Sequence, residues 1–194
     1  MANNNHASGE QNQKYEPKPD AHALTAGSNV SEDAVDYEPH PEKSIQVEPL
    51  RQKIINSICN LYSGSASGED MKVYAKEAVY DDPWSYCDTR YKIAGQWWGI
   101  PMIFASSKTL KTETVSNKPN EITFKLQQEY TPRALHWSKS INSLVTLTLD
   151  DEGKVRYHKD MWNAKDYSHE GIGMVMKHLN GDHLTKFTRP PDWL

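Results

Sequence analysis

Apolar positions first recur with helical spacing about one quarter of the way along the chain. Six of them lie on one face of a predicted helix of about four turns: Leu50, Ile54, Ile55, Ile58, Leu61 and Tyr62. The small residues of 63–68, Ser-Gly-Ser-Ala-Ser-Gly, follow directly and predict a loop. The first element of the chain is therefore an amphipathic helix beginning near residue 48.

Two further helices are predicted after this loop. The first spans 69–79, with Glu69 and Asp70 in its first turn, where acidic side chains favour the helix dipole. It must end before Pro83, because the residue preceding a proline avoids helical backbone angles. The second spans 96–106 and contains Pro101, which weakens that prediction.

The pattern then changes from helical spacing to alternation. Four segments rich in Thr, Val, Ile and aromatic residues alternate between apolar and polar positions, which is typical of strands: 109–116, 121–133, 140–150 and 154–163. Turn sequences at 117–120 and 151–153 separate neighbours and indicate antiparallel hairpins. A last helix is predicted from near Ser168 to a stop at Asn180-Gly181.

Helices followed by a run of antiparallel strands predict an α+β domain with the helices on one face of a curved sheet. This order excludes a doubly wound nucleotide-binding fold. The motifs agree, because the chain has no phosphate-binding loop and Gly171-Ile172-Gly173 lacks the third glycine of a dinucleotide fingerprint.

Composition divides the chain into two parts. Only 37% of the 194 residues are hydrophobic, and the shortfall lies in residues 1–44. That segment has eight acidic residues, three lysines and four prolines, and it contains no Ile, Phe or Trp. We expect 1–44 to be a disordered acidic tail and 45–194 to be one domain.

Charge and cysteine content exclude several classes of protein. The tail carries a net charge of −5 and the domain +1, so the domain lacks the basic surface of a nucleic-acid binder. No apolar run is long enough for a membrane span, and the N-terminus does not resemble a signal peptide. Cys59 and Cys87 cannot form a zinc site alone. We expect a cytoplasmic protein that binds neither nucleic acid nor membrane.

Several motifs in their order along the chain resemble the SnoaL-like and nuclear transport factor 2-like superfamily, which includes ketosteroid isomerase. They are Val79-Tyr80-Asp81-Asp82-Pro83-Trp84, the hairpin sequence 147–155 and Asp160-Met161-Trp162-Asn163. The sequences 158–163 and 179–182 are similar to fungal SigF-like members. The resemblance covers about residues 48–165. It implies a cone-shaped, curved antiparallel sheet wrapped around the N-terminal helices, and the predicted C-terminal helix is an addition to this cone.

Asp82 matches the position that carries the general base in ketosteroid isomerase. A carboxylate at a rigid Asp-Pro turn beside an apolar cavity is partly desolvated, which raises its pKa and its basicity. The alternative is that Asp82 only ends the preceding element and faces water. Asp81, one residue earlier, should point elsewhere.

His158, Asp160 and Trp162 alternate along the last predicted strand and should share one face. In the family's register Trp162 faces the cone, so His158 and Asp160 are candidates for acid and base catalysis. The opposite face, with Tyr157 and Met161, is apolar enough to be the buried one instead. The chain offers no third ligand at a recognisable spacing for a metal site.

Four aromatic residues are candidates for the pocket wall, with core packing as the alternative: Tyr62, Tyr80, Trp84 and Trp162. Tyr62 can also donate a hydrogen bond to a developing oxyanion, and the alternative for this residue is that it caps the core with its hydroxyl group in water. Val145 is a further candidate for contact with a ligand, and it stands where the resemblance places the protonated acid of ketosteroid isomerase. Because valine donates no hydrogen bond, steroid-type enolisation is not expected.

These observations lead to two alternative functions. In one, the pocket binds a small hydrophobic molecule and catalyses a cofactor-independent isomerisation, dehydration or cyclisation. In the other, the same fold is a non-catalytic ligand-binding or dimerisation module. The C-terminal helix is expected to cover the rim of the cone or to contact a second copy in a homodimer. Whether the protein is an enzyme stays open at this point.

Overall fold

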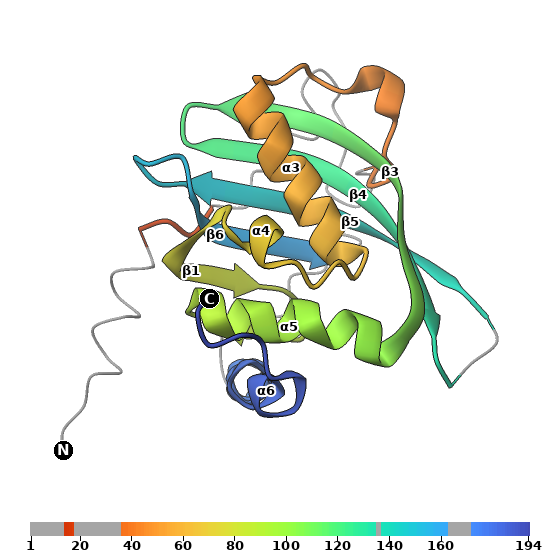
Figure 1. The fold of residues 1–194 in the computed structure, drawn as a ribbon. Coiled ribbons are helices and arrows are strands. Elements are labelled where there is room, and N and C mark those ends of the chain that lie inside the picture. Colours follow the sequence, from red (N-terminus) through yellow and green to blue (C-terminus); the bar gives the residue numbers. More distant parts are fainter. Residues whose placement is uncertain (1–13, 18–35, 135–136, 163–171) are drawn as a thin grey trace.

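A computed structural model describes residues 14–17, 36–134, 137–162 and 172–194. Within these ranges a curved six-stranded sheet carries two long helices on its concave face (Figure 1). The α+β prediction is confirmed, and it rests on a core built by α3, α5 and the inner face of the sheet. Among the described helices, none is long and apolar enough to cross a membrane.

The sheet has the strand order β2-β1-β6-β5-β4-β3. Its strands are β1 (Tyr74–Asp81), β2 (Tyr86–Cys87), β3 (Phe104–Lys118), β4 (Glu121–Pro132), β5 (Lys139–Leu149) and β6 (Val155–Trp162). All neighbours are antiparallel except β1 and β6, which run parallel. The four long strands and their hairpins lie where the alternating pattern predicted them.

The first predicted helix is confirmed as α3 (Pro49–Tyr62), which lies across the concave face. Ile58 and Leu61 are fully buried, and burial of each such side chain contributes about 1.5–3 kcal/mol. Leu50, expected on the same face, is exposed instead. The carbonyl group of Tyr62, the last residue of α3, accepts hydrogen bonds from Ser107 Oγ (2.6 Å) and Gln128 Nε2 (3.0 Å). These bonds fix the end of α3 against β3 and β4.

The prediction of a second helix over 69–79 is wrong. Only Gly68–Met71 is helical (α4), and Tyr74–Asp81 forms β1. Pairing of β1 with β6 is irregular between Tyr74 and Val79, which interrupts the alternation of a regular strand. Lys76 and Glu77 are exposed, while Tyr74 and Ala78 on either side of them are buried. The buried positions therefore have the spacing of one face of a helix.

The third predicted helix is present but displaced along the chain. It is α5 (Arg90–Ile103), capped by the Thr89 side chain, which accepts from the backbone N–H of Lys92 (3.2 Å). Pro101 lies within its last turn, and Phe104 already begins β3. α5 shows little amphipathic pattern because it packs on the sheet and α3 on one side and on α6 on the other.

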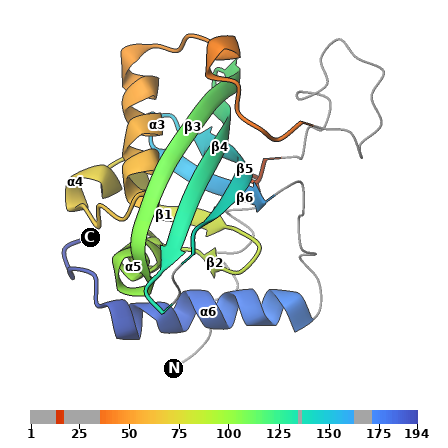
Figure 2. The same ribbon diagram turned by 90° about the vertical axis from the view of Figure 1, so that its right-hand side faces the viewer.

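The C-terminal helix is α6 (Ile172–Thr188), which lies beside α5 across one end of the sheet (Figure 2). The residues at its predicted start, 168–171, lie outside the described ranges. The predicted stop at Asn180-Gly181 is wrong, since the helix continues to Thr188. Gly181 serves close packing here, because a Cβ atom at this position would lie 2.2 Å from the carbonyl oxygen of Tyr86.

We therefore predict that Gly181→Ala destabilises the protein by about 1–3 kcal/mol, as overpacking does. Ala normally stabilises a helix relative to Gly by about 1 kcal/mol, so the sign of the effect is informative. Gly99→Ala in α5 is the matched control, because its Cβ would meet Leu184 and Thr188 at an ordinary 3.5 Å. Chemical denaturation of both variants measures the difference. Equal stability of the two would contradict close docking of α6.

The described parts of the predicted tail contact the outer face of the sheet, opposite α3. The backbone N–H of His40 donates to Glu113 Oε2 (2.7 Å), and Glu113 pairs with the buried Lys125 (3.2 Å). Residues 14–17 lie over β6, where Glu16 approaches Lys159 Nζ (3.6 Å) (Figure 2). Contacts with the domain therefore extend into 14–17 and 36–44. The disorder predicted for 1–13 and 18–35 falls outside the described residues.

Candidate functional site

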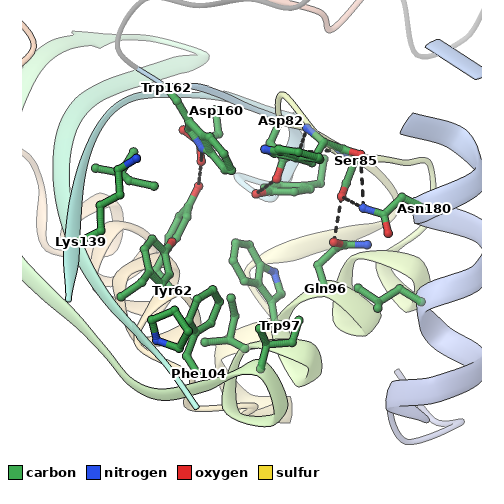
Figure 3. A pocket seen from close by; sticks show the side chains of 18 of the residues that line it. Tyr62, Asp82, Ser85, Gln96, Trp97, Phe104, Lys139, Asp160, Trp162 and Asn180 are labelled. Carbon is green, nitrogen blue, oxygen red and sulfur yellow. Dashed lines mark hydrogen bonds between the residues drawn. The ribbon is translucent and has the colours of Figure 1, made fainter. Parts of the chain in front are cut away.

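A cavity of about 330 Å³ lies between the concave face of the sheet, α5 and α6. Figure 3 shows Asp82 and Asp160 on one side of it, with Tyr62, Trp97 and Phe104 facing them. The lining residues are mostly apolar or aromatic: Tyr62, Tyr80, Asp82, Trp84, Ser85, Gln96, Trp97, Ile100, Ile103, Phe104, Tyr130, Pro132, Trp137, Lys139, Ile141, Asp160, Trp162, Asn180 and Leu184. An apolar cavity with a few polar groups is the usual form of a small-molecule site.

Asp160 is the most exceptional group in this cavity. It lies on β6, and only 2% of it is exposed. Its Oδ2 atom accepts hydrogen bonds from Tyr62 OH (2.6 Å) and Trp162 Nε1 (3.1 Å), whereas its Oδ1 atom has no partner among the described residues. Burial raises the pKa of Asp160 to about 6, and hydrogen bonding with the side chains of Tyr62, Ser143 and Trp162 opposes that rise. Asp160 is thus a buried, incompletely hydrogen-bonded carboxyl group among the residues that line the cavity.

Asp82 also lines the cavity, but both of its oxygens are occupied. Oδ1 accepts from the backbone N–H groups of Trp84 (2.7 Å) and Ser85 (2.5 Å), and Oδ2 accepts from Tyr80 OH (2.7 Å). Burial and the nearby charge of Asp160 raise the pKa of Asp82 to about 7. Asp82 therefore closes the turn between β1 and β2 while presenting a second carboxyl group to the cavity. The alternative that it faces water does not hold.

His158 is buried on the same side of β6 but is not among the cavity-lining residues. Its Nε2 lies 3.2 Å from Tyr62 OH and its Nδ1 lies 2.7 Å from Tyr74 OH. Since Tyr62 donates to Asp160, the Tyr62 oxygen accepts from His158 Nε2–H, and Nδ1 then accepts from Tyr74. Burial lowers the pKa of His158 to about 3, so the ring stays neutral.

The direct catalytic role predicted for His158 therefore lacks a geometric basis. The aromatic rings of Tyr62, Tyr74, Tyr80 and Trp97 surround the imidazole and separate it from the cavity. The imidazole contacts the Tyr62 hydroxyl group, which in turn donates a hydrogen bond to Asp160. His158 can therefore orient Tyr62 without touching a ligand.

The predicted wall residues fall into two groups. Tyr62, Tyr80, Trp84 and Trp162 all line the cavity, although Trp84 is 65% exposed and stands at its rim. Val145 does not line it, because it is fully buried in the core opposite Asp160 in the register of β5 and β6. Its predicted contact with a ligand is thus not supported, and the site has no acid at that position.

Both faces of β6 are largely buried, whereas the sequence predicted that only one of them would be buried. Asp160 and Trp162 line the cavity, while Tyr157 and Lys159 belong to the outer face. There Asp81 accepts hydrogen bonds from Tyr157 OH and Lys159 Nζ, both at 3.2 Å. Asp81 therefore points away from the cavity, as expected.

Sequence reasoning missed most of the wall contributed by other elements. Ser85 Oγ donates to Gln96 Oε1 (2.9 Å) and accepts from Asn180 Nδ2 (2.9 Å), which connects the turn after β1, α5 and α6 beside the cavity (Figure 3). Tyr130, Lys139 and Ile141 come from β4 and β5. The alternation of Lys139 and Ile141 could have indicated one shared face, whereas no local signal identifies Asn180.

No metal site emerges from the residues that the structure describes. Within those ranges, no group of three or more His, Cys, Asp or Glu side chains is placed to hold a metal ion. The titratable groups of the cavity are thus the two carboxyl groups, the tyrosines and Lys139.

The raised pKa values of Asp82 and Asp160 predict how stability depends on pH. Each folded-state pKa exceeds the ordinary value of 3.8, so the contribution of each group to stability is complete below about pH 4. It is lost as the pH rises toward 6 and 7. Asn at position 160 does not ionise, so the melting temperature of Asp160→Asn relative to wild type should rise between pH 4 and 7. A constant difference across this range would contradict desolvation of Asp160.

Comparison with known proteins shows the fold but no close relative. No family model matches the sequence, and no curated protein matches it. Among solved structures, an NTF2-like protein from Anabaena variabilis superposes with a TM-score of 0.54 at 6% identity, over 63% of this chain and 97% of that one.

Two further solved structures are similar to the chain. One has a ketosteroid isomerase-like fold, comes from Catenulispora acidiphila and was solved with trimethylamine (TM-score 0.50, 13% identity, 59% of this chain and 85% of that one). A SnoaL-like family protein from Agrobacterium tumefaciens gives a TM-score of 0.48 at 11% identity, over 60% of this chain and 99% of that one. The chain has an NTF2-like fold.

Proposed function

We propose that the cavity binds a small, largely apolar molecule and catalyses proton transfer on it without a cofactor, as an isomerase, dehydratase or cyclase. One observation carries this proposal. Asp160 lines an apolar cavity, and its buried Oδ1 atom has no hydrogen-bond partner among the described residues. An unpartnered buried carboxylate oxygen is costly for folding, and such groups concentrate at functional sites.

Asp160 would act as the general base through Oδ1. Its pKa of about 6 leaves most of the group ionised at neutral pH while keeping it more basic than an exposed aspartate. Tyr62 and Trp162 hold Oδ2, so the carboxylate plane is fixed before a ligand enters. This preorganisation lowers the cost of aligning the base with a substrate C–H or O–H group.

Asp82 would act as the partner acid. Its pKa of about 7 means that it holds a proton in a substantial fraction of molecules at neutral pH. Two carboxyl groups in one site whose pKa values differ can divide acid and base roles between them. In this scheme Asp160 takes the proton and Asp82 returns one to the substrate.

The second candidate is a non-catalytic ligand-binding or dimerisation module of the same fold. Two observations favour it: both oxygens of Asp82 already accept hydrogen bonds, and Val145 supplies no acid. We also propose that the chain is a member of the fungal SigF-like branch, and this proposal rests on the sequence resemblance alone. A test of catalysis decides between the two candidates.

Proton abstraction can be tested before the natural substrate is known. The protein is incubated in D₂O with a panel of enolisable cyclic ketones small enough for a cavity of about 330 Å³, half of them neutral and half bearing a tertiary amine. Mass spectrometry then measures deuterium incorporation at carbon. Exchange above the uncatalysed rate supports the enzyme. If no ketone exchanges faster with the wild-type protein than without protein, the non-catalytic module is the better description.

A further inference from the structure

The buried charged groups of the cavity are acidic, and its basic group is exposed. Asp82 and Asp160 are both buried, whereas Lys139, the only basic side chain among the described lining residues, is exposed. Figure 3 shows Lys139 on the far side of Tyr62 from Asp82. The interior of the cavity is therefore acidic at neutral pH.

The rest of the wall is unusually rich in aromatic rings. Eight of the lining residues are aromatic: Tyr62, Tyr80, Trp84, Trp97, Phe104, Tyr130, Trp137 and Trp162. The face of an aromatic ring is the negative part of its quadrupole and attracts cations, with Trp the strongest. Aromatic walls around buried carboxylates are suited to an organic cation more than to a neutral or anionic ligand.

From this combination we infer that the ligand carries a tertiary or quaternary ammonium group on an apolar body, and that this cation lies against Asp160 and the surrounding aromatic rings. The inference rests on the ligand cavity of the proposed function and specifies its chemical class. A tertiary ammonium N–H can donate to the Asp160 carboxylate, while a quaternary group contacts the carboxylate through its positively polarised methyl groups.

Electrostatics favours a cation over a neutral molecule of the same shape. A neutral apolar ligand would remove the remaining water from Asp160 without replacing it, which penalises the ionised carboxylate. A cation compensates the charge of Asp160 and reduces its repulsion with Asp82. Cation–π contacts contribute about 0.5–2 kcal/mol in addition.

The test compares two ligands that differ only in charge. The probes are 4-(trimethylammonio)benzyl alcohol and 4-tert-butylbenzyl alcohol, which have nearly the same shape and do not titrate between pH 5 and 8. Calorimetric titration of the full-length protein at pH 8 should show the cation binding at least about tenfold more tightly, the size of effect that cation–π and charge contacts give.

The outcomes separate this inference from the proposed function. Tighter binding of the tert-butyl compound would overturn the cationic ligand while leaving a hydrophobic cavity in place. Binding of neither compound would count against both. Deuterium exchange in neutral ketones without binding of the ammonium probe would support the enzyme and overturn the cationic ligand.

Substitution of the carboxylate provides a second, independent measurement. Asp160→Asn should lose most of the preference for the cation and bind the neutral probe at least as well as wild type. Asp151→Asn, the same change at an exposed turn residue outside the cavity, should keep the preference. Loss of affinity for both probes in Asp160→Asn would indicate a collapsed cavity, which thermal unfolding of the variant would reveal, and equal preference in both variants would overturn the role of Asp160.

The affinity for the ammonium probe should also rise with pH between about 5 and 8, since the cation binds best when Asp160 and Asp82 are ionised. The other titratable groups around them come from every neighbouring element: Tyr62, Tyr80, Cys87, Tyr130, Lys139 and His158, with Asp81 and Lys159 on the outer face. Burial raises the pKa of the tyrosines and Cys87 and lowers that of His158. A pH-independent preference would contradict the carboxylates as the source of selectivity.

Discussion

Asp160→Asn is expected to lower the rate of deuterium incorporation by a factor of about 10²–10⁴, the usual contribution of a general base. Asn keeps the shape of the side chain and can still accept from Tyr62 and Trp162, but it cannot take up the substrate proton. Because the buried charge is removed, the variant should fold at least as well as the wild-type protein. The measurement is the initial exchange rate at several pH values, together with the melting temperature.

Asp82→Asn provides the comparison that assigns the roles. The side-chain oxygen of Asn can still accept from the backbone N–H groups of Trp84 and Ser85, so the turn should persist. Exchange alone requires proton abstraction, so it should fall less in Asp82→Asn than in Asp160→Asn. If Asp82→Asn abolishes exchange and Asp160→Asn leaves it intact, the base is Asp82 and our assignment is wrong.

Lys159→Met should cost about 3–5 kcal/mol of stability, the largest effect that we expect for a single change outside the cavity. The Lys159 ammonium group lies 3.2 Å from Asp81 Oδ2, and the two side chains are only 4% and 1% exposed. Removing the lysine leaves the carboxylate of Asp81 buried with less compensation, and the methionine cannot replace the charge. Urea denaturation of the variant measures the loss.

An exposed ion pair in the same protein supplies the matched control. Lys72 and Glu69 lie 2.5 Å apart, but their side chains are 62% and 66% exposed. Lys72→Met should therefore cost less than about 1 kcal/mol. The double variant Lys159→Met with Asp81→Asn should recover part of the loss, since it also removes the buried charge. A cost for Lys159→Met no greater than that for Lys72→Met would show that the outer face is more hydrated than its burial indicates.

The sequence predicted the parts of the fold that depend on regular spacing. Five of the six apolar positions predicted for α3, all except Leu50, and the alternation of the four long strands required no information beyond the chain itself. β1 was misassigned, because its irregular pairing with β6 breaks the alternation on which the prediction depended. α6 was predicted too short because a glycine is common both at the end of a helix and inside a helix that packs closely on another segment. The sequence alone does not distinguish these two cases for Gly181.

The candidate site was predictable along each strand but not between elements. The spacing of Asp160 and Trp162 indicated that they share a face, and both line the cavity. The decisive contact joins Tyr62 to Asp160 across 98 positions of sequence, and only the packing of α3 against β6 brings them together. Likewise, the sequence could not show that Tyr62 stands between His158 and the cavity. Both faces of β6 are buried, so burial alone does not indicate which of its residues reach the cavity.

The position of α6 has a consequence for how such proteins can diverge. The two carboxyl groups stand on the sheet and its adjoining turn, whereas Asn180 and Leu184 close the cavity from a helix that follows the last strand. Substitutions on α6 can therefore alter the size and shape of the cavity while Asp82 and Asp160 stay in place. In evolution, the selectivity of the cavity can then change through substitutions in α6 without a loss of stability in the core formed by α3, α5 and the sheet.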